Sequence, residues 1–452
     1  MHFFLIHSRK ISIVRFFLPL CALLLVWISP AHAQEKPLTL EEATKIAFQN
    51  HGDIGAARET LSAAAQRITS AKSARAPQLS GTIGTNYQNG PFISSPFGQN
   101  GTNSTFTTGI ALSQNLFDSG KTKYAVRQSR ASAVSQLGGL GSARNSLAFE
   151  VAQRFFEQLR QQRLLSQREA QLALAQTQLS QIEAQIEAGA APRSDLAGAR
   201  VTVSQARFDL VTARNDLQNA VANLRNALGL ERGAPLDLAY ESPQNFDSKL
   251  DLAKELELAR SRRPDLLSLR AQIRASEAVL QSAQIDARPN VSASAGYNID
   301  PRETRDRRFT IGATVSLPIL DGGGRKSLAR AAQDELQSAR TRLAQSERDV
   351  ETEVETAFTS IAGQIERLQN ARELVQSATQ NLETATEKYR AGVGIALDVT
   401  SAASQLFTAQ TSLASAEFDY QIARSNLERS TGRFAWETEV APDANAVVEA
   451  LR

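Results

Sequence analysis

Two copies of one unit make up this chain, and that internal duplication limits its fold more than any other sequence feature. Residues 187–229 match residues 390–432 at an offset of 203, and residues 106–120 match 309–323 at the same offset. The preceding part of each copy matches at an offset of 212, so the first copy carries nine additional residues within 85–105. That stretch is rich in Gly, Asn, Ser and Pro, a composition typical of an elongated surface loop. Both copies are therefore expected to share one fold.

Each copy predicts the order short helix, strand, loop, strand, long helix, turn, short helix. In the first copy the long helix is expected over about 121–188, with shorter helices over about 41–76 and 194–230. At 1.5 Å per residue the long helix would measure about 100 Å, close to the summed length of the two shorter ones. The expected assembly is a rod in which each long helix is flanked by a broken one.

The helical segments carry apolar residues at every seventh position, with alanine three residues later. A strict seven-residue repeat imposes a left-handed coiled coil, and the alanines allow the helices to approach closely. Taken alone, these stripes would also fit a soluble coiled-coil rod. The clearest stripes are Leu196, Val203, Leu210, Leu217 and Leu224 in the first copy, and Val399, Leu406, Leu413, Tyr420 and Leu427 in the second.

Four segments alternate apolar and polar residues with the period of two that indicates a β-strand. Each spans about ten residues, the length that a tilted strand needs to cross a bilayer. The same pattern fits a soluble sheet packed on helices. The apolar faces comprise Leu79, Ile83 and Tyr87; Phe106, Ile110, Leu112 and Leu116; Val291, Ala293, Ala295 and Tyr297; and Phe309, Ile311, Ala313, Val315, Leu317 and Ile319.

Two observations favour a membrane location for these strands. The helix stripes are already used in coiled-coil packing, which leaves little apolar surface to cover a sheet. The opposite strand faces carry Ser, Thr, Gly and Asn, which suit a water-filled lumen. Backbone groups in lipid must all be hydrogen-bonded, and barrels contain at least about eight strands. Four strands per chain therefore require a barrel that is shared between copies.

The first 33 residues read as a secretory signal peptide. A basic start precedes an apolar run from Phe16 to Ile28, and Ala31-His32-Ala33 fits a cleavage site. The apolar run is shorter than the ~20 residues of a spanning helix, which disfavours a transmembrane anchor. Without this segment the chain has 47 basic and 47 acidic residues, so its charge gives no support to a nucleic-acid partner.

The residue inventory excludes several chemistries. After residue 33 the chain has no cysteine, no methionine and a single histidine, His51. Disulfides, thiol nucleophiles and Cys/His zinc sites are thereby excluded. A Ser-His-Asp arrangement could use only His51, which lies between Asn50 and Gly52 with no nucleophile motif nearby. We therefore expect no catalytic, cofactor or metal site, and a periplasmic enzyme is the least supported interpretation.

Taken in order, the motifs resemble the TolC-type outer membrane factor family of outer membrane efflux proteins. The resemblance covers nearly the whole chain after the signal peptide. No single motif is strong, but the ordered set across two repeats is specific. It consists of LTLEEATKIAFQNHGDI, NLFDSGK, EAGAAPRSDL, ARSRRPDLLSLRAQI, PILDGGGRK and RAGVGIALDV, together with the duplication.

This resemblance implies a mainly α-helical fold with a β-barrel part. A long antiparallel coiled-coil helical barrel would join a trimeric 12-stranded transmembrane β-barrel, with four strands from each chain. The expected segments are a signal peptide (1–33), a first repeat (34–230), an equatorial linker (231–249), a second repeat (250–432) and a C-terminal equatorial segment (433–452).

The resemblance also implies a function. The chain would be the outer-membrane exit channel of a tripartite efflux or type I secretion system, and would extend into the periplasm. It would form a homotrimer, contact outer-membrane lipid, and dock a periplasmic adaptor and an inner-membrane pump. Such a passive conduit needs no cofactor. A secreted, soluble coiled-coil structural or adhesive protein is the alternative.

The closed end of the tunnel is expected at the two turns between the long and returning helices. Gly189 and Gly392 would end the long helices there, because glycine readily adopts the left-handed conformation that terminates a helix. The turns Gly189-Ala190 and Gly392-Val393 are the expected adaptor-docking positions.

Asp195 and Asp398 begin the returning helices, where the helix N-terminus favours a carboxylate. That capping role could explain both residues fully. The resemblance instead implies that they form, with Tyr389, an acidic channel gate that favours cations. The sequence departs from one branch of the family at Ser401, where a second acid is expected, and at Gly394, where an arginine ties the gate shut. A weaker or differently latched gate is therefore our hypothesis.

The junctions between barrel and helices are expected at proline and glycine positions. Pro77 and Pro289 would end helices where strands begin, because proline cannot continue a helix and restricts the residue before it. Pro318, Gly120 and Gly322 follow the second strand of each copy, and the glycines would let the chain bend sharply into the long helix.

Overall fold

The computed structural model describes residues 37–91, 100–189, 192–233, 236–240, 250–299 and 307–435. The predicted signal peptide, Ala190 and most of the two predicted equatorial segments lie outside these ranges. The first copy contains α1 (Leu40–Asn50), α2 (Gly52–Ser73), β1 (Gln78–Pro91), β2 (Asn100–Phe117), α3 (Lys121–Glu187) and α4 (Arg193–Ala227). The second contains α5 (Leu252–Arg262), α6 (Pro264–Gln284), β3 (Asn290–Ile299), β4 (Arg307–Ser316), α7 (Gly324–Arg390), α8 (Ala396–Ser430) and the short 3-10 helix η1 (Arg433–Ala435).

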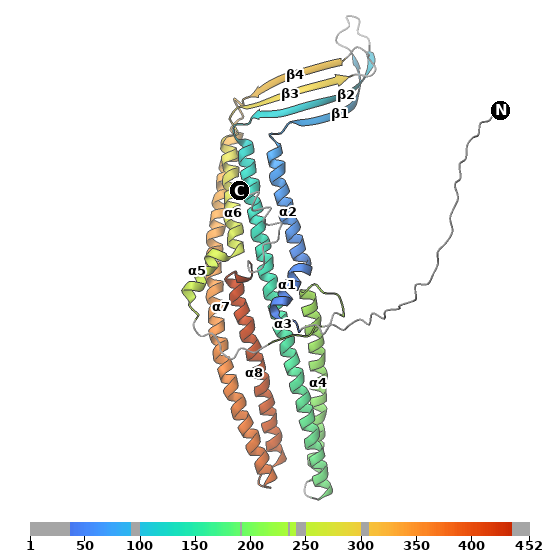
Figure 1. The fold of residues 1–452 in the computed structure, drawn as a ribbon, viewed down its shortest axis with the longest axis vertical. Coiled ribbons are helices and arrows are strands. Elements are labelled where there is room, and N and C mark those ends of the chain that lie inside the picture. Colours follow the sequence, from blue (N-terminus) through green and yellow to red (C-terminus); the bar gives the residue numbers. More distant parts are fainter. Residues whose placement is uncertain are drawn as a thin grey trace, which may run out of the picture.

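The molecule is a long helical shaft with a small sheet at one end (Figure 1). The 67-residue helices α3 and α7 run through the shaft, so each measures about 100 Å. Near the sheet they lie beside α2 and α6, and toward the other end they form two hairpins with α4 and α8. The predicted rod, with its long and broken helices, is confirmed.

The predicted seven-residue stripes form the seams of these hairpins. In α4 the stripe buries Val203, Leu210 and Leu224, and its other two members, Leu196 and Leu217, are half-buried. In α8 the same stripe buries Tyr420 and Leu427, and in α7 it buries Val354, Ile361 and Leu368. The alanines three residues later in α4 are also buried, at Ala206, Ala213, Ala220 and Ala227. Among the described helices, none is long and apolar enough to cross a membrane.

One expectation was wrong: the short helix predicted over 41–76 is two helices that meet at His51. The residue has extended backbone (φ −71°, ψ 129°), ends α1, and caps α2 by accepting a hydrogen bond from the Asp53 N–H at Nδ1. Arg263, at the offset of 212, has the same extended backbone (φ −64°, ψ 124°) between α5 and α6. There Pro264 explains the break, since it lacks an N–H and disfavours helical backbone in the residue before it.

These two breaks, which we call the elbows, receive the ends of the returning helices. Gly229 follows α4 with a φ of 67°, and a Cβ there would lie 2.9 Å from the carbonyl carbon of Asn50. Gly432 follows α8 with a φ of 75°, and its Cβ would lie 3.1 Å from the carbonyl oxygen of Arg262. Glycine is needed twice over, for its backbone conformation and for the close approach. The duplication therefore extends to the packing at mid-shaft.

The four strands form one antiparallel sheet in the order β1-β2-β3-β4. β3 and β4 have about the predicted ten residues, but β1 has 14 and β2 has 18. β4 ends at Ser316, so Leu317 and Ile319, which were predicted to lie on its apolar face, follow the strand. Residues expected in the loop of the first copy thus pair as strand. The alternation also changes at the end of β2, where a bulge after Asn115 pairs Phe117, and not Leu116, with Val291.

Candidate functional site

The sheet presents one continuous apolar face, because the strand registers place the apolar residues of all four strands in line. Leu79 pairs with Leu112, which pairs with Ala295, which pairs with Ile311. Residues directly opposite in adjacent strands point to the same side of a sheet. Leu79 is 72% exposed and Ile311 is 78% exposed, so none of the described helices covers that face.

The opposite face is small and polar, as the alternation predicts. One row across it is Gln78, Ser113, Ser294 and Gly312, and the next is Ser80, Ala111, Gly296 and Thr310. A sheet with one apolar exposed face and one polar face matches a wall between lipid and water. The outermost strands β1 and β4 each pair on one side only within the described chain.

An aspartate holds the start of each long helix where the sheet meets the shaft. Asp118 accepts hydrogen bonds from the N–H groups of Gly120 (3.0 Å) and Thr122 (2.7 Å), and from Arg75 (3.3 Å). The equivalent Asp321 accepts from the N–H groups of Gly323 (3.1 Å) and Arg325 (2.9 Å). These bonds satisfy N–H groups that a helix leaves free in its first turn, where a negative charge is also favoured.

A third aspartate, Asp286, links the two long helices. It follows α6 and forms ion pairs with Lys121 of α3 (2.5 Å) and Arg325 of α7 (3.0 Å). The hydrogen bond from Lys121 is the main reason why the pKa of Asp286 lies below its ordinary value. Arg325 also pairs with Asp321, at 3.2 Å. The junction is therefore an ionic cluster drawn from three separate segments, which sequence spacing alone did not predict.

The predicted junction residues lie at the sheet end of the shaft. Pro77 and Pro289 directly precede β1 and β3, and Pro318 lies two residues after β4. Gly120 caps α3 with a φ of 97°, as the predicted bend requires. In the second copy Gly322 has a φ of 63°, but the cap of α7 is the next residue, Gly323, at 89°. The offset of 203 between the two copies pairs Gly120 with Gly323, so the duplication could have identified Gly323 as the cap of α7.

Asp118 is expected to make the junction sensitive to strong acid. Burial disfavours its charged form, but the hydrogen bonds from Thr122, Gly120 and Arg75 outweigh burial and lower the pKa from 3.8 to about 2. Since the folded pKa is the lower one, the stabilisation is complete above about pH 4 and is lost as the pH falls toward 2. A difference in pKa of this size contributes on the order of 2 kcal/mol to the free energy of unfolding.

The matched substitutions Asp118→Asn and Asp321→Asn test whether the charged Asp118 carboxylate stabilises the junction. Asp118→Asn should lower the thermal midpoint of the detergent-solubilised protein at neutral pH and flatten its dependence on pH between 2 and 4. Asp321→Asn should have a smaller effect, because that carboxylate is more exposed, at 31% against 7%. An unchanged pH profile in Asp118→Asn would contradict the assignment.

The two predicted turns lie together at the end of the shaft remote from the sheet (Figure 1). Gly189 (φ 74°) and Gly392 (φ 72°) follow the C-caps of α3 and α7, as predicted. At the second turn the N–H of Gly392 donates to the carbonyl of Tyr389, and that of Val393 to Lys388. This is the glycine-terminated motif that satisfies the last carbonyls of a helix. Val393 is 79% exposed, and Ala190 lies outside the described residues.

Of the three predicted gate residues, Tyr389 makes a contact between the hairpins. Its hydroxyl donates a 2.6 Å hydrogen bond to Oε1 of Gln185 in α3. Both residues line a cavity of 700 Å³ between α3, α7 and α8. Asp195 and Asp398 occupy equivalent places in the first turns of α4 and α8. Gln185 was not predicted, since its partner is 204 residues away in sequence.

The two departures from the family pattern also lie at these turns. Gly394 sits tightly against the end of α7, where a Cβ would lie 3.1 Å from the Tyr389 nitrogen. Its N–H donates to the Lys388 carbonyl, so it completes the turn. Ser401 is exposed on α8. Among the described residues, no group of three or more His, Cys, Asp or Glu side chains could hold a metal ion.

Comparisons with known proteins agree with this architecture. The sequence profile of the family described as "Outer membrane efflux protein" matches residues 44–230 and 256–433. The outer membrane efflux protein BepC of Brucella suis is 23% identical over 402 residues, 87% of this chain and 85% of that protein. The outer membrane protein TolC of Escherichia coli is 26% identical over 388 residues, 82% of this chain and 77% of that protein.

A solved structure shows the same fold. The CmeC outer membrane channel of Campylobacter jejuni superposes with a TM-score of 0.77, covering 91% of this chain and 89% of that one, at 16% identity. The profile match accounts for most of both repeats, and the structural match covers 91% of the chain. These findings support an outer-membrane channel over the alternative of a secreted structural or adhesive rod. The chain belongs to the outer membrane efflux protein family.

Proposed function

We propose that three copies of this chain form a passive exit duct that crosses the outer membrane and extends through the periplasm. The observation that carries the proposal is the four-stranded sheet, whose single exposed apolar face is aligned in register across every strand. Lipid would cover that face and water the opposite one. The shaft of about 100 Å would then form the wall of the periplasmic tunnel.

Two features support a ring of identical chains. The strands β1 and β4 leave one edge each without a partner in the described chain, and lipid does not tolerate open sheet edges. Closure by three copies gives twelve strands. On α4, moreover, the apolar residues Val201, Phe208 and Val211 are 70%, 69% and 57% exposed. A neighbouring copy would cover these exposed side chains.

The turns at the far end supply the surface proposed for docking an adaptor, which would connect the duct to an inner-membrane pump. Val393, Ile395 and Leu397 are all more than half exposed there. Residues 1–33 would direct export and be removed. The boundaries of the two repeats and the equatorial segments 231–249 and 433–452 belong to the same proposal, as does the absence of catalysis.

Membrane extraction tests the duct directly. The protein should fractionate with the outer membrane, require detergent for release, and run as a trimer by light scattering. In planar bilayers the purified trimer should give discrete conductance steps. A monomer that dissolves freely without detergent would overturn the proposal, because the sheet would then have neither lipid nor a closed ring.

Tyr389→Phe is expected to weaken the closed state of the duct. The substitution removes one hydrogen bond between the hairpins, and such a bond contributes about 0.5–1.5 kcal/mol. The trimer loses three such bonds, so bilayer recordings should show the open fraction rising by at least roughly twofold to tenfold. Gln185→Ala should have the same effect, and the double variant should add nothing further. Additive effects of the two substitutions would show that the pair does not act as one contact.

Asp398→Ala is expected to reduce the preference of the channel for cations. Three symmetry-related carboxylates at the turns would concentrate cations at the constriction, as rings of acidic side chains do in cation channels. Reversal potentials in a salt gradient, and block by divalent cations, measure the effect. Asp334→Ala, which removes an exposed carboxylate from α7, is the control. If both variants keep the cation preference, the capping role alone explains Asp398.

A further inference from the structure

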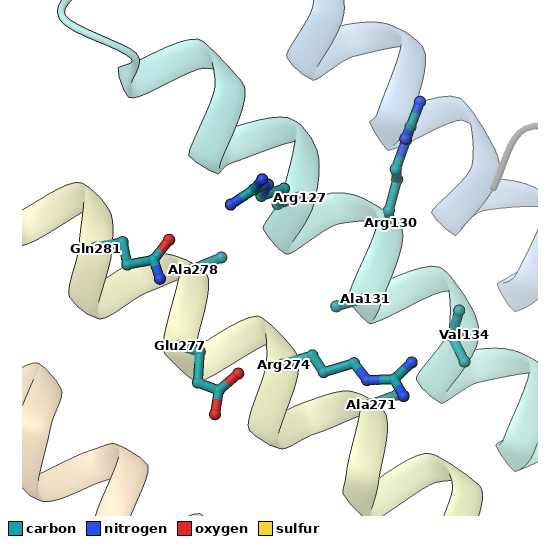
Figure 2. A pocket seen from close by; sticks show the side chains of 9 residues that line it. All are labelled: Arg127, Arg130, Ala131, Val134, Ala271, Arg274, Glu277, Ala278 and Gln281. Carbon is teal, nitrogen blue, oxygen red and sulfur yellow. The ribbon is translucent and has the colours of Figure 1, made fainter. Parts of the chain in front are cut away.

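We propose that the groove between α3 and α6 binds an elongated organic dianion, with one acid group held by Arg127 and the other by Arg274. The groove encloses a cavity of 320 Å³ in the half of the shaft nearest the sheet. Its lining is shown in Figure 2. A cavity of this volume is at the lower end of the range for small-molecule sites.

Complementary faces of two antiparallel helices form the groove. On α3 the lining residues are Arg127, Arg130, Ala131 and Val134, and on α6 they are Ala271, Arg274, Glu277, Ala278 and Gln281. Spacings of three and four place each set on one side of its helix. The helices run in opposite directions, so Arg127 lies toward the end with Gln281, and Arg274 lies toward the end with Val134 (Figure 2).

The floor between the two arginines is apolar and narrow. Ala131, Ala271 and Ala278 are 8%, 1% and 5% exposed, so their methyl groups form a surface that is shielded from bulk water. Val134 extends that surface at one end. A flat hydrocarbon body would pack mainly against Val134 and the aliphatic stems of the two arginines, because the alanines below have little surface left to bury. The site therefore favours an organic anion over a simple inorganic one.

The charge of the groove is positive and uncompensated. Within the part of the chain that the structure describes, Arg127 and Arg274 form no ion pair. Arg127 instead stacks over the ring of Tyr124, 5.6 Å from its centroid. Arg130 contributes less to the groove, because Figure 2 shows its side chain directed away from α6.

The one carboxylate in the lining, Glu277, is already used. It accepts a hydrogen bond from Arg340 of α7 at 3.2 Å, and Figure 2 shows it directed away from α3. Arginine binds planar acid groups with two parallel hydrogen bonds, which is the contact that the groove lacks. Other arginines in the shaft do pair with a carboxylate of a neighbouring helix, for example Arg270 with Glu347 and Arg263 with Glu353.

Calorimetry with naphthalene-2,6-disulfonate tests the inference on the full trimer in nanodiscs of phosphatidylcholine. This probe is rigid, water-soluble and carries one acid group at each end. We expect saturable binding to the wild type, and at least tenfold weaker binding to Arg127→Gln and to Arg274→Gln. Tenfold corresponds to about 1.4 kcal/mol. Arg342→Gln, which removes an exposed arginine of α7 outside the groove, is the matched control and should bind like the wild type.

A second probe separates two-point binding from simple charge attraction. Naphthalene-2-sulfonate has the same body and one acid group, so it should bind the wild type at least tenfold more weakly. Three results would overturn the inference: no heat in the wild type at millimolar probe, equal losses in Arg342→Gln and the groove variants, or equal affinities for the two probes. The experiment rests on the trimer of the proposed function, whose assembly is checked first by light scattering. Because binding is then measured without conductance, a failure to bind would leave the proposed duct standing.

Discussion

Replacing Ile311 by arginine should prevent the chain from entering the outer membrane as a stable trimer. Ile311 is the fifth of the ten residues of β4 and is 78% exposed on the apolar face. An arginine on the lipid side of a barrel costs about 2–4 kcal/mol near the bilayer midplane. In a threefold ring the cost is incurred three times. The measurement is the fraction of detergent-extracted protein that is trimeric, relative to the wild type.

The matched control is Thr314→Arg, three residues further along the same strand. Thr314 pairs with Ser292 on the polar face, where the proposed lumen would hydrate the new charge. The trimer should therefore form at near wild-type yield. Equal loss of trimer in both variants would show that the two faces of the sheet are not lipid and water, and the proposed orientation would be wrong.

Gly138→Ala is expected to separate α3 from α6 and to destabilise the shaft. A Cβ at this position would lie 2.7 Å from the carbonyl oxygen of Pro264 and 2.8 Å from the nitrogen of Ser268. Both are backbone atoms at the start of α6, so they cannot rotate away. The hydrogen bond of 2.8 Å between the hydroxyls of Ser135 and Ser268 would also lengthen. Such overpacking costs about 1–3 kcal/mol, measurable as a lower thermal midpoint.

The neighbouring glycine provides a control of opposite sign. A Cβ on Gly139 would meet only the side-chain oxygen of Gln136, at 3.9 Å. Alanine is favoured over glycine inside a helix by about 0.5–1 kcal/mol, so Gly139→Ala should raise the midpoint slightly. If both substitutions shift the midpoint in the same direction, the contact between Gly138 and α6 does not determine the packing.

Long regular segments were predictable from the sequence. The long helix expected over 121–188 is observed as Lys121–Glu187. Its C-terminal part carries a seven-residue stripe of Leu165, Leu172, Leu179 and Ile186, and a glycine follows its end. The strand faces were predictable too, since alternation with a period of two directly sets the side to which each residue points. The alignment of the four apolar faces was not predictable from any single strand, because it depends on the three pairing registers between the strands.

Features that depend on distant partners were not predictable. His51 interrupts a stretch that otherwise favours helix, and its equivalent Arg263 is held by Asp265 and Glu353 and by the Ser430 carbonyl, 167 residues further on. The polar residues at the start of β2 read as a loop, yet they extend the ladder because β1 supplies hydrogen-bonding partners across the hairpin. Sequence propensity is local, whereas both outcomes depend on tertiary pairing.

The candidate site likewise contains residues that were predictable from local sequence and contacts that were not. Gly189 and Gly392 were found because a left-handed terminating residue leaves a signal in the sequence itself. The contact between Tyr389 and Gln185, and the cluster around Asp286, each join segments far apart in the chain. Only the folded arrangement shows these partners, although each residue type is common in any coiled coil.

The elbows affect how the two hairpins of the shaft can tilt. Because α4 and α8 end there while α3 and α7 continue, each hairpin below an elbow acts as a lever held at one end. The 35 residues of α4 make that lever about 50 Å long. A tilt of about one degree at the elbow then moves the turn by about 1 Å. In the proposed duct, rotations of a few degrees at mid-shaft would therefore widen the opening between the tips of the three copies by about the diameter of a small solute.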